Sequence, residues 1–126
     1  MNSVLIVEDY QSIKDQYAVA FQHAGFEVDT AHSGAEGLEK VETFQKVKGR
    51  EYTVIVLDIL MLELSGTDFL RVFEPAKHPN TKVVVVSNLD SPNVIEKAKS
   101  LGAVDYLIKA QYTPKQLVEH VQSLLV

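Results

Sequence analysis

Five residues with charged or reactive side chains follow short hydrophobic runs at four separate points of the chain. Glu8 and Asp9 follow VLIV, Asp58 follows VIVL, Ser87 ends VVVVS, and Lys109 follows YLI. An uncompensated carboxylate inside a hydrophobic run is costly, because ionised groups lose their hydration there. Asp58 must therefore lie at the mouth of its run or have partners.

The residue types indicate phosphoryl chemistry if the five side chains meet. Clustered carboxylates repel one another unless a cation holds them, and oxygen ligands without sulfur suit Mg²⁺ or a similar divalent ion. Asp58 can then act as a nucleophile towards a phosphoryl group, while the metal and the Lys109 ammonium stabilise the transferred oxygens. Ser87 can donate a hydrogen bond to the bound group. The pattern predicts an aspartyl phosphate at Asp58.

Each residue taken alone also has an ordinary structural interpretation. Asp9 can cap a helix, and Glu8 can be a solvated residue at the end of a strand. Ser87 can be a loop hydroxyl, and an exposed side chain is the usual fate of a lysine such as Lys109. The joint occurrence of acid pair, acid, hydroxyl and lysine at four strand ends is what favours a shared site.

The elements that must position these residues alternate between strand and helix. Short apolar runs at residues 4–7, 26–31, 52–57, 82–87 and 104–108 are each followed by a segment with helical spacing. Runs such as VIVL and VVVV are apolar on both faces, as in parallel strands covered on two sides. We predict an α/β fold, a doubly wound, flavodoxin-like (βα)5 sheet of five parallel strands in the order 2-1-3-4-5. That order gathers the polar strand ends at one crevice.

Helix boundaries follow from capping residues. We expect helices at about residues 10–24, after Ser33, from Ser65–Gly66, from about Ser91, and after Thr113 with Pro114 at the first helical position. Phe69, Leu70, Val72 and Phe73 should point largely inward. The basic stretch KVKGR at residues 46–50 is expected to be an exposed loop.

Length and composition fit one globular domain. The chain has 126 residues, of which 46% are hydrophobic and 23% charged, so residues 1–126 are expected to form a single domain without an output domain. A net charge of −5 argues against nucleic acid or an anionic membrane as the main partner. The N-terminus lacks the basic region of a signal peptide, and we expect a cytoplasmic location.

Four motifs together resemble the receiver domain of two-component response regulators, in particular the single-domain, chemotaxis-regulator type. The resemblance covers the whole chain through VLIVED, VIVLDILM with Gly66 eight residues after Asp58, VVVVS, and GAVDYLIK. It implies that Asp58 accepts a phosphoryl group from a sensor histidine kinase or a phosphotransfer protein. Such a domain catalyses its own phosphorylation and dephosphorylation and is not a conventional enzyme.

The resemblance also assigns roles to individual residues. It implies that Glu8, Asp9 and the carbonyl of Leu60 hold Mg²⁺ together with Asp58. Ser87 and Lys109 would bind the phosphoryl oxygens, and Tyr106 would be an aromatic switch that turns inward when Ser87 moves towards the phosphate. A half-buried strand aromatic is the alternative for Tyr106. A downstream protein effector would bind helix 4, strand 5 and helix 5, where Lys97, Asp105 and Gln116 are expected to be exposed.

Three residues depart from the pattern of the family. Leu62 and Ala110 stand where the family usually has proline, and Asn88 stands where it favours a small residue. The Lys109 loop is therefore expected to be trans or strained, and Asn88 to crowd the phosphoryl entrance or add a hydrogen bond there. These departures leave a rival hypothesis, a protein-binding module with the receiver fold that works without phosphorylation. A receiver excised from a longer chain is a further alternative.

Overall fold

The computed structural model describes residues 1–61 and 64–126. The strands are β1 (Ser3–Val7), β2 (Glu27–Ala31), β3 (Val54–Leu57), β4 (Lys82–Ser87) and β5 (Asp105–Ile108). The α-helices are α1 (Gln11–His23), α2 (Gly34–Lys48), α3 (Gly66–Phe73), α4 (Pro92–Ser100) and α5 (Pro114–Leu124). Two short 3₁₀ helices, η1 (Pro75–Lys77) and η2 (Lys109–Gln111), precede β4 and follow β5.

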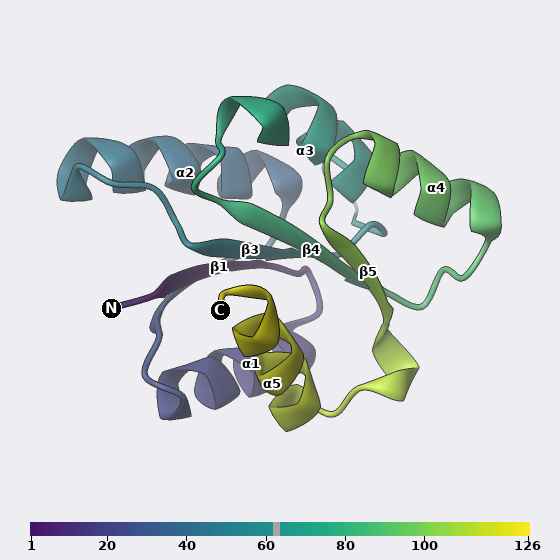
Figure 1. Cartoon of the computed structure of the whole chain (residues 1–126), viewed down its shortest axis with the longest axis horizontal. Coiled ribbons are helices and arrows are strands. Elements are labelled where there is room, and N and C mark those ends of the chain that lie inside the picture. Colours follow the sequence, from purple (N-terminus) through teal and green to yellow (C-terminus); the bar gives the residue numbers. More distant parts are fainter. Residues whose placement is uncertain (62–63) are drawn as a thin grey trace.

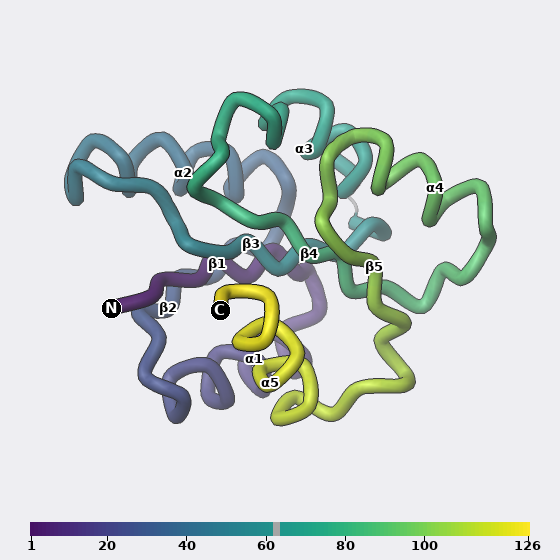
Figure 2. Tube along the Cα trace, in the orientation of Figure 1, coloured from purple at the N-terminus to yellow at the C-terminus, as the bar shows by residue number. Residues whose placement is uncertain are grey.

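The sheet has the predicted architecture. Its strands run parallel in the order β2-β1-β3-β4-β5, which confirms the doubly wound α/β prediction. At the carboxyl ends Val7 pairs with Leu57, and Ser87 pairs with Ile108. Residues that follow these strands therefore emerge together, and Figure 2 shows the chain leaving β1, β4 and β5 on one side of the sheet.

Helices cover both faces of the sheet. Figure 1 shows α2, α3 and α4 on one face and α1 and α5 on the other. Alternate residues of β1 serve the two cores: Leu5 packs with the cluster that contains Phe69, whereas Ile6 packs with the cluster that contains Phe21. Burial on both faces explains why β1, β3 and β4 lack polar alternation, whereas the edge strand β2, with the sequence EVDTA, is mostly half-buried. None of the helices in the described ranges is both long enough and apolar enough to cross a bilayer.

Two predicted helix starts are confirmed by capping bonds. The Ser33 hydroxyl accepts a hydrogen bond from the Glu36 N–H at 3.1 Å, at the start of α2. Thr113 and Gln116 form a capping box at the start of α5, with each side chain accepting from the other residue's backbone N–H. Such bonds satisfy backbone donors that the first helical turn leaves free.

Two local predictions were wrong. Residues 46–48 are the last turn of α2 and not a loop, and the helix ends at Gly49 with a left-handed φ of 69°. Basic side chains suit a helix C-terminus, and Lys46 also pairs with Glu42 at 2.8 Å. Val72 is 60% exposed because it lies outside the arc of α3 that Phe69, Leu70 and Phe73 turn towards the core.

The first residue of α3 packs directly against the backbone that follows β3. A Cβ atom at Gly66 would lie 2.3 Å from the Asp58 carbonyl oxygen and 2.7 Å from the Ile59 Cα. The Gly66 N–H also donates to the Ile59 carbonyl at 3.0 Å. Only glycine permits this approach without a backbone shift, so Gly66 helps to fix the segment that carries Asp58.

We predict that Gly66→Ala destabilises the fold by about 1–3 kcal/mol, since the new methyl group must push backbone and not a flexible side chain. Urea unfolding followed by circular dichroism measures this loss. Thr67→Ala is the matched control, because it alters the next residue of α3 without adding a Cβ atom. Equal stability of Gly66→Ala and the unmodified protein would contradict the close approach.

Candidate functional site

Asp58 lies immediately after β3, in the middle of the sheet. Its side chain is 8% exposed, and its backbone N–H donates to the Val7 carbonyl of β1 at 3.1 Å. One carboxylate oxygen, Oδ1, accepts a hydrogen bond from the Leu60 N–H at 3.3 Å. Asp58 is therefore at the end of its hydrophobic run, as predicted, but most of its surface is buried.

Glu8 lies beside it, immediately after β1. Its side chain is 3% exposed, and its Oε2 accepts a hydrogen bond from the Tyr10 N–H at 3.1 Å. The Glu8 backbone N–H donates to Ala31 at the end of β2 at 3.0 Å. The solvated strand-end interpretation of Glu8 is wrong, because this carboxylate is held inward.

The Lys109 ammonium joins the two buried carboxylates. Its Nζ donates to Glu8 Oε1 at 2.7 Å and to Asp58 Oδ2 at 3.2 Å. The lysine side chain is 15% exposed, so the alternative of an ordinary surface lysine is also wrong. Lys109 begins η2, and peptide bonds in the described ranges are all trans, so the lysine loop takes the trans form.

Burial and the mutual contact shift the pKa values of Glu8 and Lys109. Burial raises the pKa of Glu8, and the hydrogen bond from Lys109 offsets part of that effect. Burial disfavours the ammonium form of Lys109, but the hydrogen bond that it donates to Glu8 and the charge of Asp58 together raise its pKa above the ordinary value. The lysine thus stays charged and compensates the carboxylates.

Asp9 completes an acidic cluster at the mouth of the site. Carboxylate oxygens of Glu8, Asp9 and Asp58 lie within 4.8 Å of one another. Asp9 is exposed, and it does not cap α1, whose N-cap is Tyr10 without a side-chain capping bond. An all-oxygen donor set with one solvent-accessible member fits a hydrated Mg²⁺ ion.

Ser87 and Tyr106 meet at the loop between β4 and α4. The buried Ser87 hydroxyl accepts from the Leu89 N–H at 3.2 Å, and the Tyr106 hydroxyl donates to the Leu89 carbonyl at 2.7 Å. The Tyr106 side chain is buried, and burial raises its pKa. Ser87 and Tyr106 therefore bond the two backbone groups of one loop residue, Leu89.

Leu60 and Leu62 are two further positions that the sequence singled out. The Leu60 side chain is 59% exposed, and the role of its carbonyl as a metal ligand stays a prediction. Leu62 lies outside the described residues.

Of the two alternatives predicted for Asn88, the structure shows an added hydrogen bond, with Ala110 as a partner that was not predicted. The Ala110 N–H donates to Asn88 Oδ1 at 2.9 Å, so the amide of Asn88 turns to the lysine loop. The sequence named both residues as separate departures from the family pattern. Pairing of Ser87 with Ile108 places them side by side, and this register was the missing information.

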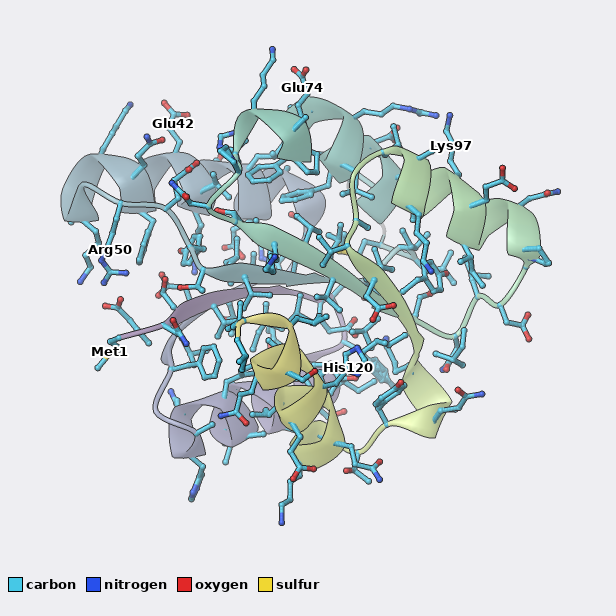
Figure 3. All side chains as sticks on the ribbon, in the orientation of Figure 1. Met1, Glu42, Arg50, Glu74, Lys97 and His120 are labelled. Atoms are coloured by element: carbon cyan, nitrogen blue, oxygen red, sulfur yellow. The ribbon has the colours of Figure 1, made fainter. Side chains whose placement is uncertain are left out.

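Asp105, which was predicted to be exposed, contacts other residues of the fold. Asp105 is half-buried, its Oδ2 lies 2.7 Å from His120 Nε2 of α5, and its Oδ1 accepts from the Tyr106 N–H at 2.8 Å. The expectation of an exposed Asp105 was therefore wrong, because its carboxylate contacts both Tyr106 of β5 and His120 of α5. Lys97 and Gln116 are exposed as expected, and Figure 3 shows Lys97 pointing outward from α4.

Residues 4–122 match the response regulator receiver domain. The chain belongs to this family. Receiver domains belong to two-component signalling, and the match covers β2 to β5, all of β1 except Ser3, and every site residue described above. The resemblance inferred from the four motifs is confirmed.

Several known proteins resemble this receiver domain along its length. Response regulator SaeR of Staphylococcus aureus is 30% identical over 125 residues, which cover 99% of this chain and 51% of SaeR. The chain thus spans about half the length of the curated relatives it matches. Chemotaxis protein CheY4 of Vibrio cholerae has a TM-score of 0.81 at 28% identity, with 99% of each chain covered. A CheY-like receiver domain protein from Methanospirillum hungatei has a TM-score of 0.86 at 26% identity, covering 99% of this chain and 94% of its own.

Removal of the lysine should raise the pKa of Glu8 further. In Lys109→Met the hydrogen bond that opposes burial is lost, so metal-free protein should show a higher Glu8 titration midpoint by carboxyl ¹³C NMR. When the pKa of Glu8 is higher in the folded than in the unfolded state, the native state binds more protons at pH values between these two pKa values. Stability should therefore fall as pH rises through that interval, and more steeply in the variant.

Lys115→Met is the matched control, because Lys115 is exposed in the first turn of α5. It removes the same charge without touching Glu8. An unchanged Glu8 midpoint in Lys109→Met would contradict the 2.7 Å contact.

Proposed function

We propose that Asp58 accepts a phosphoryl group from the phosphohistidine of a sensor histidine kinase or a phosphotransfer protein. The observation that supports this most is the buried Asp58 carboxylate, which lies 3.2 Å from the Lys109 ammonium and among the oxygens of Glu8 and Asp9. A carboxylate at the end of a strand with a fixed cation beside it suits an incoming anionic group.

The transfer exchanges one bond to phosphorus for another. A carboxylate oxygen of Asp58 forms the new P–O bond while the P–N bond of the phosphohistidine breaks. The electron pair of that bond returns to the imidazole, which takes a proton from solvent. Lys109 stabilises the charge on the transferred oxygens, and the Ser87 hydroxyl donates a hydrogen bond to one of them.

The acidic cluster would hold a divalent cation during this reaction. Glu8, Asp9 and Asp58, with the Leu60 carbonyl, are the residues that would bind Mg²⁺. When bound, the ion supplies positive charge that offsets the carboxylates and the phosphoryl oxygens. Water that reaches the acyl phosphate reverses the modification, so the domain acts as a self-modifying switch and not as an enzyme with turnover on a separate substrate.

Phosphorylation would be transmitted through the loop after β4. Ser87 accepts from the Leu89 N–H and Tyr106 donates to the Leu89 carbonyl, so movement of the Ser87 hydroxyl towards a phosphoryl oxygen would disturb Leu89, the residue whose carbonyl holds the Tyr106 hydroxyl. Tyr106 would then turn further inward and alter the surface of α4, β5 and α5.

A protein effector would bind the surface formed by α4, β5 and α5. Lys97 of α4 and Gln116 of α5 offer exposed polar contacts on either side of β5. We place the protein in the cytoplasm, acting as one receiver domain over residues 1–126, with no output domain within them. The net charge of −5 favours protein partners over direct contact with nucleic acid or membrane.

We predict one added phosphoryl group per chain after incubation with Mg²⁺ and acetyl phosphate or phosphoramidate. Intact-mass spectrometry measures the gain, and Asp58→Ala or removal of Mg²⁺ by EDTA should abolish it. Asp90→Ala is the control, because it removes an exposed carboxylate from the loop after β4 and should still react. Failure of the unmodified protein with both small donors and with kinase would favour a binding module that works without phosphorylation.

A second prediction separates the chemistry from the switch. Ser87→Ala should still gain a phosphoryl group, at a reduced rate, because Asp58 and Lys109 are retained. The Tyr106 ring resonances, assigned by NMR with Tyr106→Phe, should shift on phosphorylation of the unmodified protein and stay unchanged in Ser87→Ala. An equal shift in both proteins would show that Ser87 does not connect the two sites.

A further inference from the structure

The Asn88 side chain bridges the loop after β4 and the turn after β5. Its Oδ1 accepts the Ala110 N–H at 2.9 Å across 22 residues of sequence. Both residues are exposed, so the bond lies at the surface of the site. It joins the residue that follows Ser87 to the residue that follows Lys109.

The register of the sheet explains what this bond does to the lysine. Ser87 and Ile108 are the last paired residues of β4 and β5. The Ala110–Asn88 bond extends the connection between the two strands beyond the sheet, with a side-chain amide oxygen in place of a backbone carbonyl. Lys109 therefore lies between two residues that are each anchored to the β4 segment.

We propose that Asn88 is a positioning residue that holds the Lys109 turn at the phosphoryl site. The inference rests on the proposed function and adds a residue to it. With its backbone fixed on both sides, Lys109 can hold its ammonium 2.7 Å from Glu8 and 3.2 Å from Asp58. Without the Asn88 bond, the turn is anchored on one side only, and the long lysine side chain samples positions away from Asp58.

The same bond sets the distance between the two groups that contact the phosphoryl oxygens. Ser87 ends β4 and Asn88 follows it directly, so the Asn88 bond ties the Lys109 turn to the segment that carries the Ser87 hydroxyl. Leu89, the next residue, is held in turn by Ser87 and Tyr106. Asn88 thus links the lysine turn to the loop that Tyr106 holds.

The test compares Asn88→Ala with the unmodified protein in three measurements. The Ala110 amide proton should exchange with solvent at least severalfold faster in the variant. Phosphorylation by acetyl phosphate at saturating Mg²⁺ should be about three- to tenfold slower, the range that corresponds to one hydrogen bond. Mg²⁺ affinity, measured by NMR titration of phosphate-free protein, should stay within about twofold, because the acidic cluster is intact.

Asn93→Ala is the matched control. It truncates an exposed amide in the first turn of α4, for which the described residues show no side-chain hydrogen bond. All three quantities should keep their original values. A global loosening of the fold would instead move the Mg²⁺ affinity together with the rate.

Two results overturn the inference. An Ala110 amide that exchanges equally fast in both proteins means that the bond is not formed in solution. Lost protection at Ala110 with an unchanged phosphorylation rate means that the bond does not position Lys109.

Failure of the proposed function gives a different result. If the unmodified protein accepts no phosphoryl group, Asn88→Ala and Lys109→Met are combined in a double-mutant cycle followed by urea unfolding. Non-additive shifts of the midpoint support positioning of Lys109 by Asn88, and additive shifts overturn it.

Discussion

The contact of one ammonium group with two buried carboxylates is the interaction on which the rest of this site depends. The side chains of Glu8 and Asp58 are 3% and 8% exposed, and two buried carboxylates are costly unless a positive charge compensates them. Lys109 supplies this charge. It lies 101 residues from Glu8 and 51 residues from Asp58 in the sequence. No local segment could assemble this trio, so its existence depends on the order of the strands.

The strand order and the two-sided core satisfy that requirement together. β1 lies between β2 and β3, so Glu8 and Asp58 leave adjacent strands, and β4 and β5 carry Ser87 and Lys109 to the same edge. Strands covered by helices on both faces leave only their ends for polar groups. Gly66 adds a local constraint, because α3 begins in backbone contact with the Asp58 peptide. The hydrophobic core thereby determines where the charged groups can lie.

The sequence predicted those features that depend on residue type and spacing. Apolar runs, capping residues such as Thr113 and the polar strand ends determine the elements, their order and the residues that meet. Features that depend on partners across the fold were not predictable. Asp105 was expected to be exposed because its contact with His120 requires the placement of α5 on β5, and the Asn88–Ala110 bond requires the register of β4 and β5. Val72 was assigned inward because a pattern of apolar residues does not give the width of the buried arc.

The geometry of the lysine also explains how one residue can serve the resting and the reacting site. An ammonium group has three N–H donors, and among the described residues Lys109 uses two of them for Glu8 and Asp58. The remaining donor can reach a phosphoryl oxygen while the contact with Glu8 persists. In the proposed transfer Asp58 becomes an acyl phosphate and loses its own negative charge, so the hydrogen bond that it accepts from Lys109 would weaken and the lysine would have to adjust. The Lys109 turn is bonded to Asn88, and the next residue, Leu89, is held by Ser87 and Tyr106. The proposed adjustment of the lysine would therefore displace the β4–α4 loop when a phosphoryl group binds.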